Sequence, residues 1–273
     1  MLKRIFYLIL LCGNLFYVPE LSAKSQEITI NGDHSKLAAI LQTPDNVQKY
    51  PLVIIMHGFA SQKEAPLLKQ IADNLEAAKI ASIRFDFNGH GASGGRFQDM
   101  TILNEIEDAK RVYEYARNLP EVTSVGLSGH SQGGVVASML AGDLGADQIS
   151  ALALLAPASV IHDNARNSEF FGIYYEADFL PEYIEIFGRR IGRNYLLTAR
   201  DLPIYETAKK YQGSVLVLHG EADDIVPYTY GEKYHHIYKN SELKLLPNFD
   251  HNFTQNMSLA AKIISDYFNN KLH

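Results

Sequence analysis

The chain has 273 residues, of which 47% are hydrophobic and 21% are charged, and its formal net charge is −6. This composition supports one large domain with a substantial core and excludes a strongly basic protein, so we do not expect nucleic acid as a partner. Cys12 is the only cysteine, and no cluster of histidines and carboxylates has metal-ligand spacing, so we expect neither a disulfide in the mature chain nor a metal or other cofactor.

Residues 1–23 differ in composition from the rest of the chain. Lys3 and Arg4 precede an apolar run over residues 5–18, and the segment ends on the small residue Ala23. This pattern is typical of a secretory signal peptide cleaved after Ala23. A membrane anchor fits less well, because the apolar run is shorter than the roughly 20 residues that span a bilayer.

Two other interpretations of this segment stay open, a buried N-terminal helix and a lipoprotein signal that uses Cys12. The lipoprotein signal would want a small residue where Leu11 stands. With the signal peptide removed, residues 24–273 would form a secreted or periplasmic domain without stable membrane insertion. The sequence leaves open whether this domain forms a homodimer.

Strand patterns recur along the mature chain. Residues 26–30 and 36–43 predict a hairpin at the edge of a sheet, with a turn at 31–33. Later apolar runs predict buried strands at 52–56, 81–85, 122–127, 151–155, 215–218 and 243–246. Most of these runs are separated by stretches of helical periodicity. The alternation predicts a mostly parallel central sheet flanked by helices, in which sites form at the carboxyl ends of strands.

One segment breaks this alternation. Residues 157–203 connect a predicted strand to a helix that begins near Ile204, and they are too many for an ordinary connection. We interpret the segment as a small cap inserted into the α/β domain.

The most informative motif is Gly-His-Ser-Gln-Gly at residues 129–133. A serine between two glycines indicates only a turn, but here an apolar strand precedes the motif and helical spacing follows it. That order predicts a nucleophile elbow, a tight turn on which the Ser131 hydroxyl stands clear of the backbone. Gly129 and Gly133 supply the room that such a turn requires.

A serine hydroxyl becomes a useful nucleophile only when a base takes its proton and an acid orients the base. His251 follows the last predicted strand, and Asp223 and Asp224 follow the strand before it. We predict Ser131 as nucleophile, His251 as base and Asp223 as acid, with Asp224 as the alternative acid. Asp250, beside the base, is interpreted as a loop cap. The other histidines have less support as the base, among them His57, His90, His130 and His219.

Two backbone N–H groups are expected to hold the negative oxygen of a tetrahedral intermediate. Gln132 follows the nucleophile at the start of a helix, where backbone donors are free. Phe59 lies in the loop after strand 52–56 and is our second candidate donor. The glycine-rich residues 88–95 are interpreted as a structural loop, because no lysine or helix follows them at phosphate-loop spacing.

With these motifs placed, the chain resembles the α/β hydrolases over residues 26–268 and, more narrowly, the bacterial cinnamoyl (feruloyl) esterases. The matching segments are residues 85–94, 129–134, 156–158, 202–206 and 219–227. The resemblance implies an α/β-hydrolase fold, a triad of Ser131, Asp223 and His251, and a cap over an acyl pocket. It also implies that polar cap residues receive the phenolic hydroxyl of a hydroxycinnamoyl group. The candidates for that contact are Asp163, Tyr174 and Tyr175.

The function implied is a serine esterase that hydrolyses small hydroxycinnamate esters through an acyl-enzyme. The alternative is a short-chain aliphatic carboxylesterase or lipase-like hydrolase with the same machinery. A peptidase would usually need a larger companion domain, and an inactive binding protein would commonly lack part of the machinery. Both are therefore less favoured.

Overall fold

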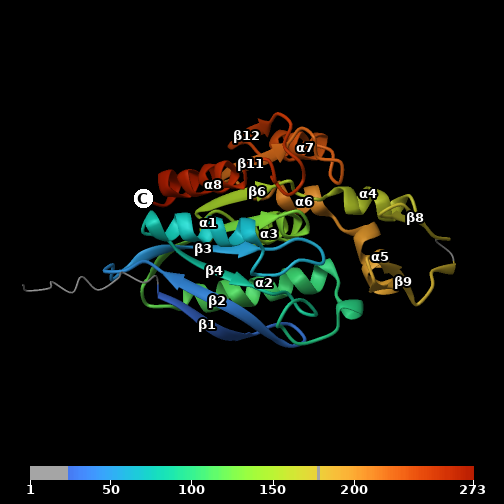
Figure 1. Cartoon of the computed structure of the whole chain (residues 1–273), viewed down its shortest axis with the longest axis horizontal. Coiled ribbons are helices and arrows are strands. Elements are labelled where there is room, and N and C mark those ends of the chain that lie inside the picture. The colour runs from blue at the N-terminus through green and yellow to red at the C-terminus, as the bar shows by residue number, and fades with distance from the viewer. Residues whose placement is uncertain (1–23, 177–178) are drawn as a thin grey trace, which may run out of the picture.

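The computed structural model describes residues 24–176 and 179–273, and the predicted signal peptide, residues 1–23, lies outside this part of the chain. At its centre is a sheet with strand order β1-β2-β4-β3-β5-β6-β11-β12 (Figure 1). β1 pairs antiparallel with β2, and β2 with β4, whereas the neighbours from β4 to β12 are parallel. The predicted edge hairpin and mostly parallel sheet are confirmed. The strands are β1 (Lys24–Asn31), β2 (Lys36–Thr43), β3 (Tyr50–Met56), β4 (Ala81–Phe85), β5 (Val122–His130), β6 (Ala151–Leu155), β11 (Ser214–Gly220) and β12 (Ser241–Leu246).

Helices cover both faces of the sheet because the central strands are apolar on both sides. In β3, Val53 and Ile55 pack against α1 and α8, whereas Leu52 and Ile54 belong to the core formed with α2 and α3. Every residue of β3 is buried, as expected for a strand of a covered parallel sheet. The helices of this layer structure are α1 (Pro66–Ala77), α2 (Ile102–Arg117), α3 (Gln132–Leu144), α6 (Ile204–Ala208), α7 (Thr229–Ile237) and α8 (Met257–Leu272), with a 3₁₀ turn η1 (Phe97–Asp99).

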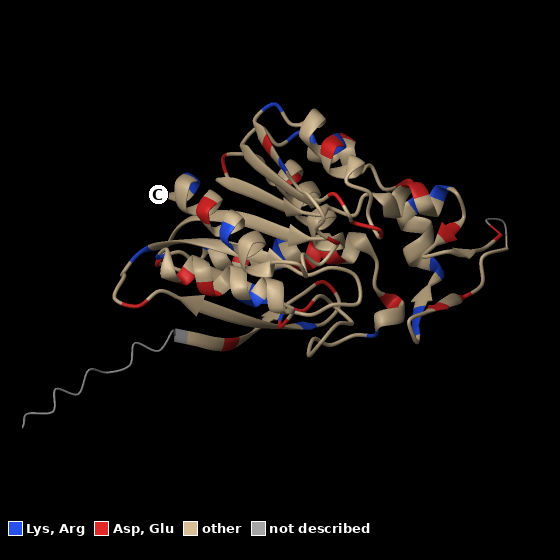
Figure 2. Cartoon of the chain, turned by 45° about the horizontal axis from the view of Figure 1, so that its top comes forward, with Lys and Arg blue, Asp and Glu red and all other residues tan. Residues whose placement is uncertain are grey.

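Between β6 and α6 the described residues form two helices and two small hairpins, which we call the cap. Figure 1 shows α4, α5, β8 and β9 gathered at one end of the molecule, beyond the sheet. In the view of Figure 2, acidic and basic residues are interspersed along the cap. No helix within the described residues is long and apolar enough to cross a bilayer. The cap elements are α4 (Val160–Arg166), β7 (Glu169–Phe170), β8 (Ile173–Tyr174), β9 (Tyr183–Ile186), β10 (Arg189–Gly192) and α5 (Arg193–Asp201).

Candidate active site

Ser131 stands between the end of β5 and the start of α3. Its φ is +56°, in the left-handed region that residues other than glycine rarely adopt. The backbone around it is fixed, because its N–H donates to the Leu155 carbonyl at 2.9 Å and its carbonyl accepts from Ala158 at 3.0 Å. This is the strained strand-to-helix turn expected of a nucleophile elbow.

The two elbow glycines are required by close backbone approach. A Cβ atom on Gly129 would overlap the backbone of Gly133. A Cβ atom on Gly133 would lie 2.6 Å from the Met56 carbonyl oxygen of β3. Either side chain would force the turn away from the sheet, so the spacing of the motif follows from the packing of α3 against β3 and β5.

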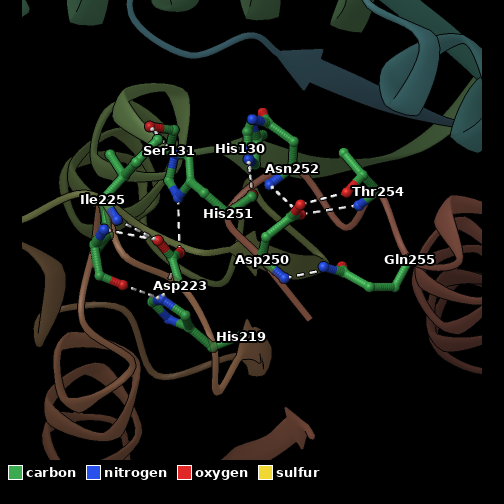
Figure 3. Close-up of polar contacts among 11 residues, drawn as sticks. His130, Ser131, His219, Asp223, Ile225, Asp250, His251, Asn252, Thr254 and Gln255 are labelled. Atoms are coloured by element: carbon green, nitrogen blue, oxygen red, sulfur yellow. Dashed lines mark hydrogen bonds and ion pairs between the residues drawn. The ribbon is translucent and has the colours of Figure 1, made fainter. Parts of the chain in front are cut away.

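The structure brings Ser131, His251 and Asp223 together, although the three lie far apart in sequence (Figure 3). His251 Nε2 lies 2.9 Å from Ser131 Oγ, and its Nδ1 lies 2.7 Å from Asp223 Oδ2. All three residues are buried. With Asp223 ionised, Nδ1–H donates to the carboxylate and Nε2 is left to accept the hydroxyl proton, which is the arrangement a general base requires.

Asp223 is held as an anion by donors on both oxygens. Oδ1 accepts the Ile225 and Val226 N–H groups at 3.0 and 2.8 Å, and Oδ2 lies 3.2 Å from His219 Nε2. Burial alone would raise its pKa, but hydrogen bonds from His219, His251 and the Val226 N–H outweigh burial and lower the pKa below the ordinary 3.8. The alternative acid, Asp224, is exposed and lies on the wall of a cavity, whereas the bond to His251 Nδ1 is made by Asp223.

Two further buried histidines brace the triad, and the sequence analysis did not assign them this role. His130 Nε2 donates to the His251 carbonyl at 2.8 Å, and burial lowers the His130 pKa to about 3, so its ring is neutral. His219 Nε2 also faces the Val226 carbonyl at 2.8 Å. The available signal was position, since His130 ends β5 directly before Ser131 and His219 lies one residue before the end of β11 and the loop of Asp223. Asp250 accepts the Asn252 and Thr254 N–H groups, which confirms it as a loop cap.

The two candidate oxyanion donors both lie close to Ser131. Gln132 is the first residue of α3, and the loop of Phe59 passes Ser131, since a Cβ on Gly58 would lie 3.4 Å from Ser131 Oγ. His57 accepts the Phe87 N–H at 3.1 Å through Nε2, so its Nδ1–H donates to the Gly58 carbonyl at 2.8 Å. Because the two groups of a trans peptide point in opposite directions, this bond fixes where the Phe59 N–H points.

The Gln132 side chain links the core to the cap. Its Nε2 donates to Glu105 of α2 at 2.7 Å, and its Oε1 accepts the Tyr195 hydroxyl of α5 at 2.6 Å. All three side chains are buried. Burial raises the pKa of Glu105 to about 8, an effect that the hydrogen bond from Gln132 reduces and nearby Asp108 increases. Sequence reasoning missed Glu105 because a single glutamate on an amphipathic helix carries no local signal of burial.

The buried carboxyl of Glu105 predicts a pH-dependent gain in stability for Glu105→Gln. The unfolded glutamate ionises near pH 4.5 and the folded one near pH 8, so wild-type stability falls as pH rises between these values. Glutamine cannot ionise and keeps an oxygen for Gln132. We expect its advantage in unfolding free energy to grow by up to about 5 kcal/mol from pH 4.5 to pH 8.5, at about 1.4 kcal/mol per pKa unit.

Urea unfolding at the two pH values measures this difference. Glu107→Gln, which changes a partly exposed acid two residues along the same helix, is the matched control and should follow wild type. A Glu105→Gln advantage that is the same at both pH values would contradict the prediction.

A cavity of about 330 Å³ opens on Ser131 and Gln132 beneath the cap. Polar side chains also reach its wall, namely Asn164, Glu169 and Asp224. Its aromatic lining consists of Phe59, Phe170, Phe171, Phe187 and Tyr195. A volume of this size suits a small organic group rather than a long chain. Among the residues that the structure describes, no group of histidine, cysteine or carboxylate side chains is arranged to hold a metal ion.

The three predicted substrate contacts, Asp163, Tyr174 and Tyr175, are not among the residues that line this cavity. Asp163 accepts the Tyr230 hydroxyl at 2.8 Å, whereas Val160 and Asn164 of the same helix line the cavity. Tyr174 is 79% exposed. The hydroxyl of Tyr175 donates to the Ala165 carbonyl at 3.3 Å within the cap.

Comparisons with known proteins agree with this geometry. A family model described as serine aminopeptidase, S33, matches residues 48–181. The solved structure of Est1E from Butyrivibrio proteoclasticus with ferulic acid bound is 31% identical, has a TM-score of 0.86, and is matched over 89% of this chain and 98% of that one.

Two curated relatives are more distant. Protein ABHD12B of Homo sapiens is 27% identical over 212 residues, 74% of this chain and 56% of its own length. The lysophosphatidylserine lipase ABHD12 of Danio rerio is 25% identical over 232 residues, 80% of this chain and 58% of its own length. The chain therefore spans little more than half the length of these curated relatives.

Proposed function

We propose a substrate class for this protein from the premise that the chain belongs to the α/β hydrolases and resembles the bacterial cinnamoyl (feruloyl) esterases. It is a serine ester hydrolase. The substrates that we propose are esters of hydroxycinnamic acids. The observation that carries this proposal is the cavity of about 330 Å³ at Ser131, with aromatic side chains around it.

In the proposed mechanism, Ser131 Oγ attacks the ester carbonyl carbon while its proton passes to His251 Nε2. The Asp223 carboxylate stabilises the imidazolium that forms, and the Phe59 and Gln132 N–H groups donate to the oxyanion. His251 then gives the proton to the leaving alcohol oxygen as the carbon–oxygen bond breaks, which leaves an acyl-enzyme. Water then attacks this intermediate as His251 takes its proton, and His251 returns the proton to Ser131 Oγ as the acyl–oxygen bond breaks and the acid leaves.

The cavity wall supports a planar, aromatic acyl group with a polar end. Phenylalanine rings favour edge-to-face and offset-stacked contacts with another ring. Asn164 and Glu169 are the polar cap residues on this wall, and we propose that they receive the phenolic hydroxyl in place of Asp163, Tyr174 and Tyr175. Glu169 Oε1 already accepts the Gly172 N–H at 2.5 Å, which orients its carboxylate.

The lipid-ester alternative has support from the relative described as a lysophosphatidylserine lipase. The charge of the cavity argues against that substrate here. Its lining includes the acids Glu169 and Asp224 and, among the described residues, no lysine, arginine or histidine. An anionic headgroup in this space would have no cation to pair with, and burying an unpaired charge is costly.

A set of methyl esters separates these alternatives, because the leaving group is constant. We expect kcat/KM for methyl ferulate to exceed that for methyl butyrate by about tenfold or more, an advantage of about 1.4 kcal/mol in the transition state. Lysophosphatidylserine completes the panel as the anionic lipid ester. Faster turnover of methyl butyrate or of the lipid would overturn the proposed substrate class while leaving the esterase mechanism intact.

A further inference from the structure

The two cap hairpins have the same two residues, Phe-Gly, in their loops. The sequence is Glu-Phe-Phe-Gly at 169–172 and Glu-Ile-Phe-Gly at 185–188. Each Phe-Gly pair is the complete loop between two paired strands, β7 with β8 and β9 with β10. The φ angles are +49° and +77° at the first tip and +51° and +69° at the second. Positive φ at both loop residues is the pattern of a type I′ turn.

Phenylalanine is a poor choice for the first position of such a turn. Asparagine, aspartate and glycine are favoured there, because a bulky side chain is strained at positive φ. Both phenylalanines are also exposed, Phe171 by 39% and Phe187 by 74%. Each tip therefore combines a bulky residue at positive φ with an exposed phenylalanine side chain. The same combination occurs at both hairpins of the cap. Residues held in strained conformations cluster where they contact ligands.

The rings of these two phenylalanines contact each other at the cavity. Phe171 and Phe187 both line it, and their ring centres lie 5.3 Å apart at an interplanar angle of 73°. Phe171 also contacts Phe59, at 5.6 Å between ring centres. Phe59 in turn supplies a candidate oxyanion donor beside Ser131. A continuous series of rings thus runs from the reacting centre to the exposed tip of the second hairpin.

We propose that the two Phe-Gly tips form a clamp that selects flat, conjugated acyl groups, with Phe171 and Phe187 as specificity-determining residues. The inference rests on the proposed function, whose acyl cavity these rings border. A flat acyl group has one rigid face and edge, which suit two rings that meet at a steep angle. The corresponding saturated acyl chain must first lose the freedom of the single bond that replaces the double bond, which weakens its binding.

Phe187→Asn tests the clamp, because asparagine suits a type I′ turn better than phenylalanine. The substrates are methyl cinnamate and methyl 3-phenylpropanoate, which differ only in the double bond. We expect KM for methyl cinnamate to rise about tenfold and KM for methyl 3-phenylpropanoate by less than about threefold, with kcat retained. The melting temperature should equal or exceed that of wild type, since asparagine adopts the positive φ of this position with less strain than phenylalanine.

Two further variants control the result. Phe187→Tyr keeps the ring and should retain the wild-type KM for methyl cinnamate. Phe179→Asn removes another exposed cap phenylalanine, 80% exposed and away from the cavity wall, and should behave as wild type.

The clamp is wrong if Phe187→Asn leaves the cinnamate KM unchanged, raises both KM values equally, or lowers the melting temperature. The result is independent of the methyl ferulate test. A wild-type enzyme that favours methyl butyrate, yet loses its cinnamate selectivity on Phe187→Asn, would overturn the proposed substrate and support the clamp. An enzyme that turns over neither aromatic ester would overturn both.

Discussion

Replacing Ser131 with alanine is expected to lower kcat for methyl ferulate by about 10⁴- to 10⁶-fold. The hydroxyl oxygen forms the bond to the acyl carbon, and it is the group that faces His251 Nε2, at 2.9 Å. The fold should survive, because the strained backbone at this position is held by hydrogen bonds of its own N–H and carbonyl. Steady-state hydrolysis and labelling with a fluorophosphonate probe measure the loss.

Ser128→Ala is the matched control for this variant. Ser128 lies on the same strand and is buried, and its hydroxyl has no hydrogen-bond partner within the described part of the chain. It should therefore retain turnover and probe labelling. A Ser131→Ala protein that still turns over methyl ferulate at a rate near wild type would refute the proposed nucleophile.

Asp223→Asn is expected to lower kcat by about 10³- to 10⁴-fold with little change in KM. An amide would still hydrogen-bond His251 Nδ1, at 2.7 Å from Asp223 Oδ2, but it can favour the wrong ring tautomer and carries no charge to stabilise the imidazolium. The fold should persist, because Asn can accept the Ile225 and Val226 N–H groups through its side-chain oxygen.

Asp224→Asn decides between the two neighbouring acids. Asp224 is exposed on the cavity wall, so its replacement should alter KM and keep kcat within about tenfold of wild type. A larger kcat loss in Asp224→Asn than in Asp223→Asn would reverse the assignment of the acid.

The sheet and the triad could be predicted from sequence because both depend on short, local patterns. The run before Ser131 is apolar, and two glycines flank Ser131 itself at fixed spacing. About fifteen residues are therefore enough to predict the strand, the elbow and the helix. Asp223 and His251 follow apolar strands directly, and parallel strands bring their carboxyl ends together. Most predicted strands are shorter than the strands in the structure, as in β5, which is predicted to end at residue 127 and continues to His130.

The cap and the buried partners of the site could not be predicted in the same way. The cap strands β7 and β8 are two residues each, too short for periodicity to reveal. In α4 a rotation of one position decides whether Asp163 or Asn164 reaches the cavity, and that rotation is set by packing. Glu105 contacts Gln132, which is distant in sequence, and His219 contacts Asp223 only because the loop between them folds back. Neither contact could be predicted without the structure.

The hydrogen bond from Tyr195 to Gln132 sets a condition for exchanging the cap between related enzymes. The cap is one continuous segment between β6 and α6, whereas the triad and both candidate oxyanion donors lie outside it. Acyl selectivity could therefore be transplanted as a single cassette. The incoming segment must still bring a hydroxyl to Gln132 Oε1, because a graft without it would leave a buried amide oxygen unsatisfied beside the nucleophile.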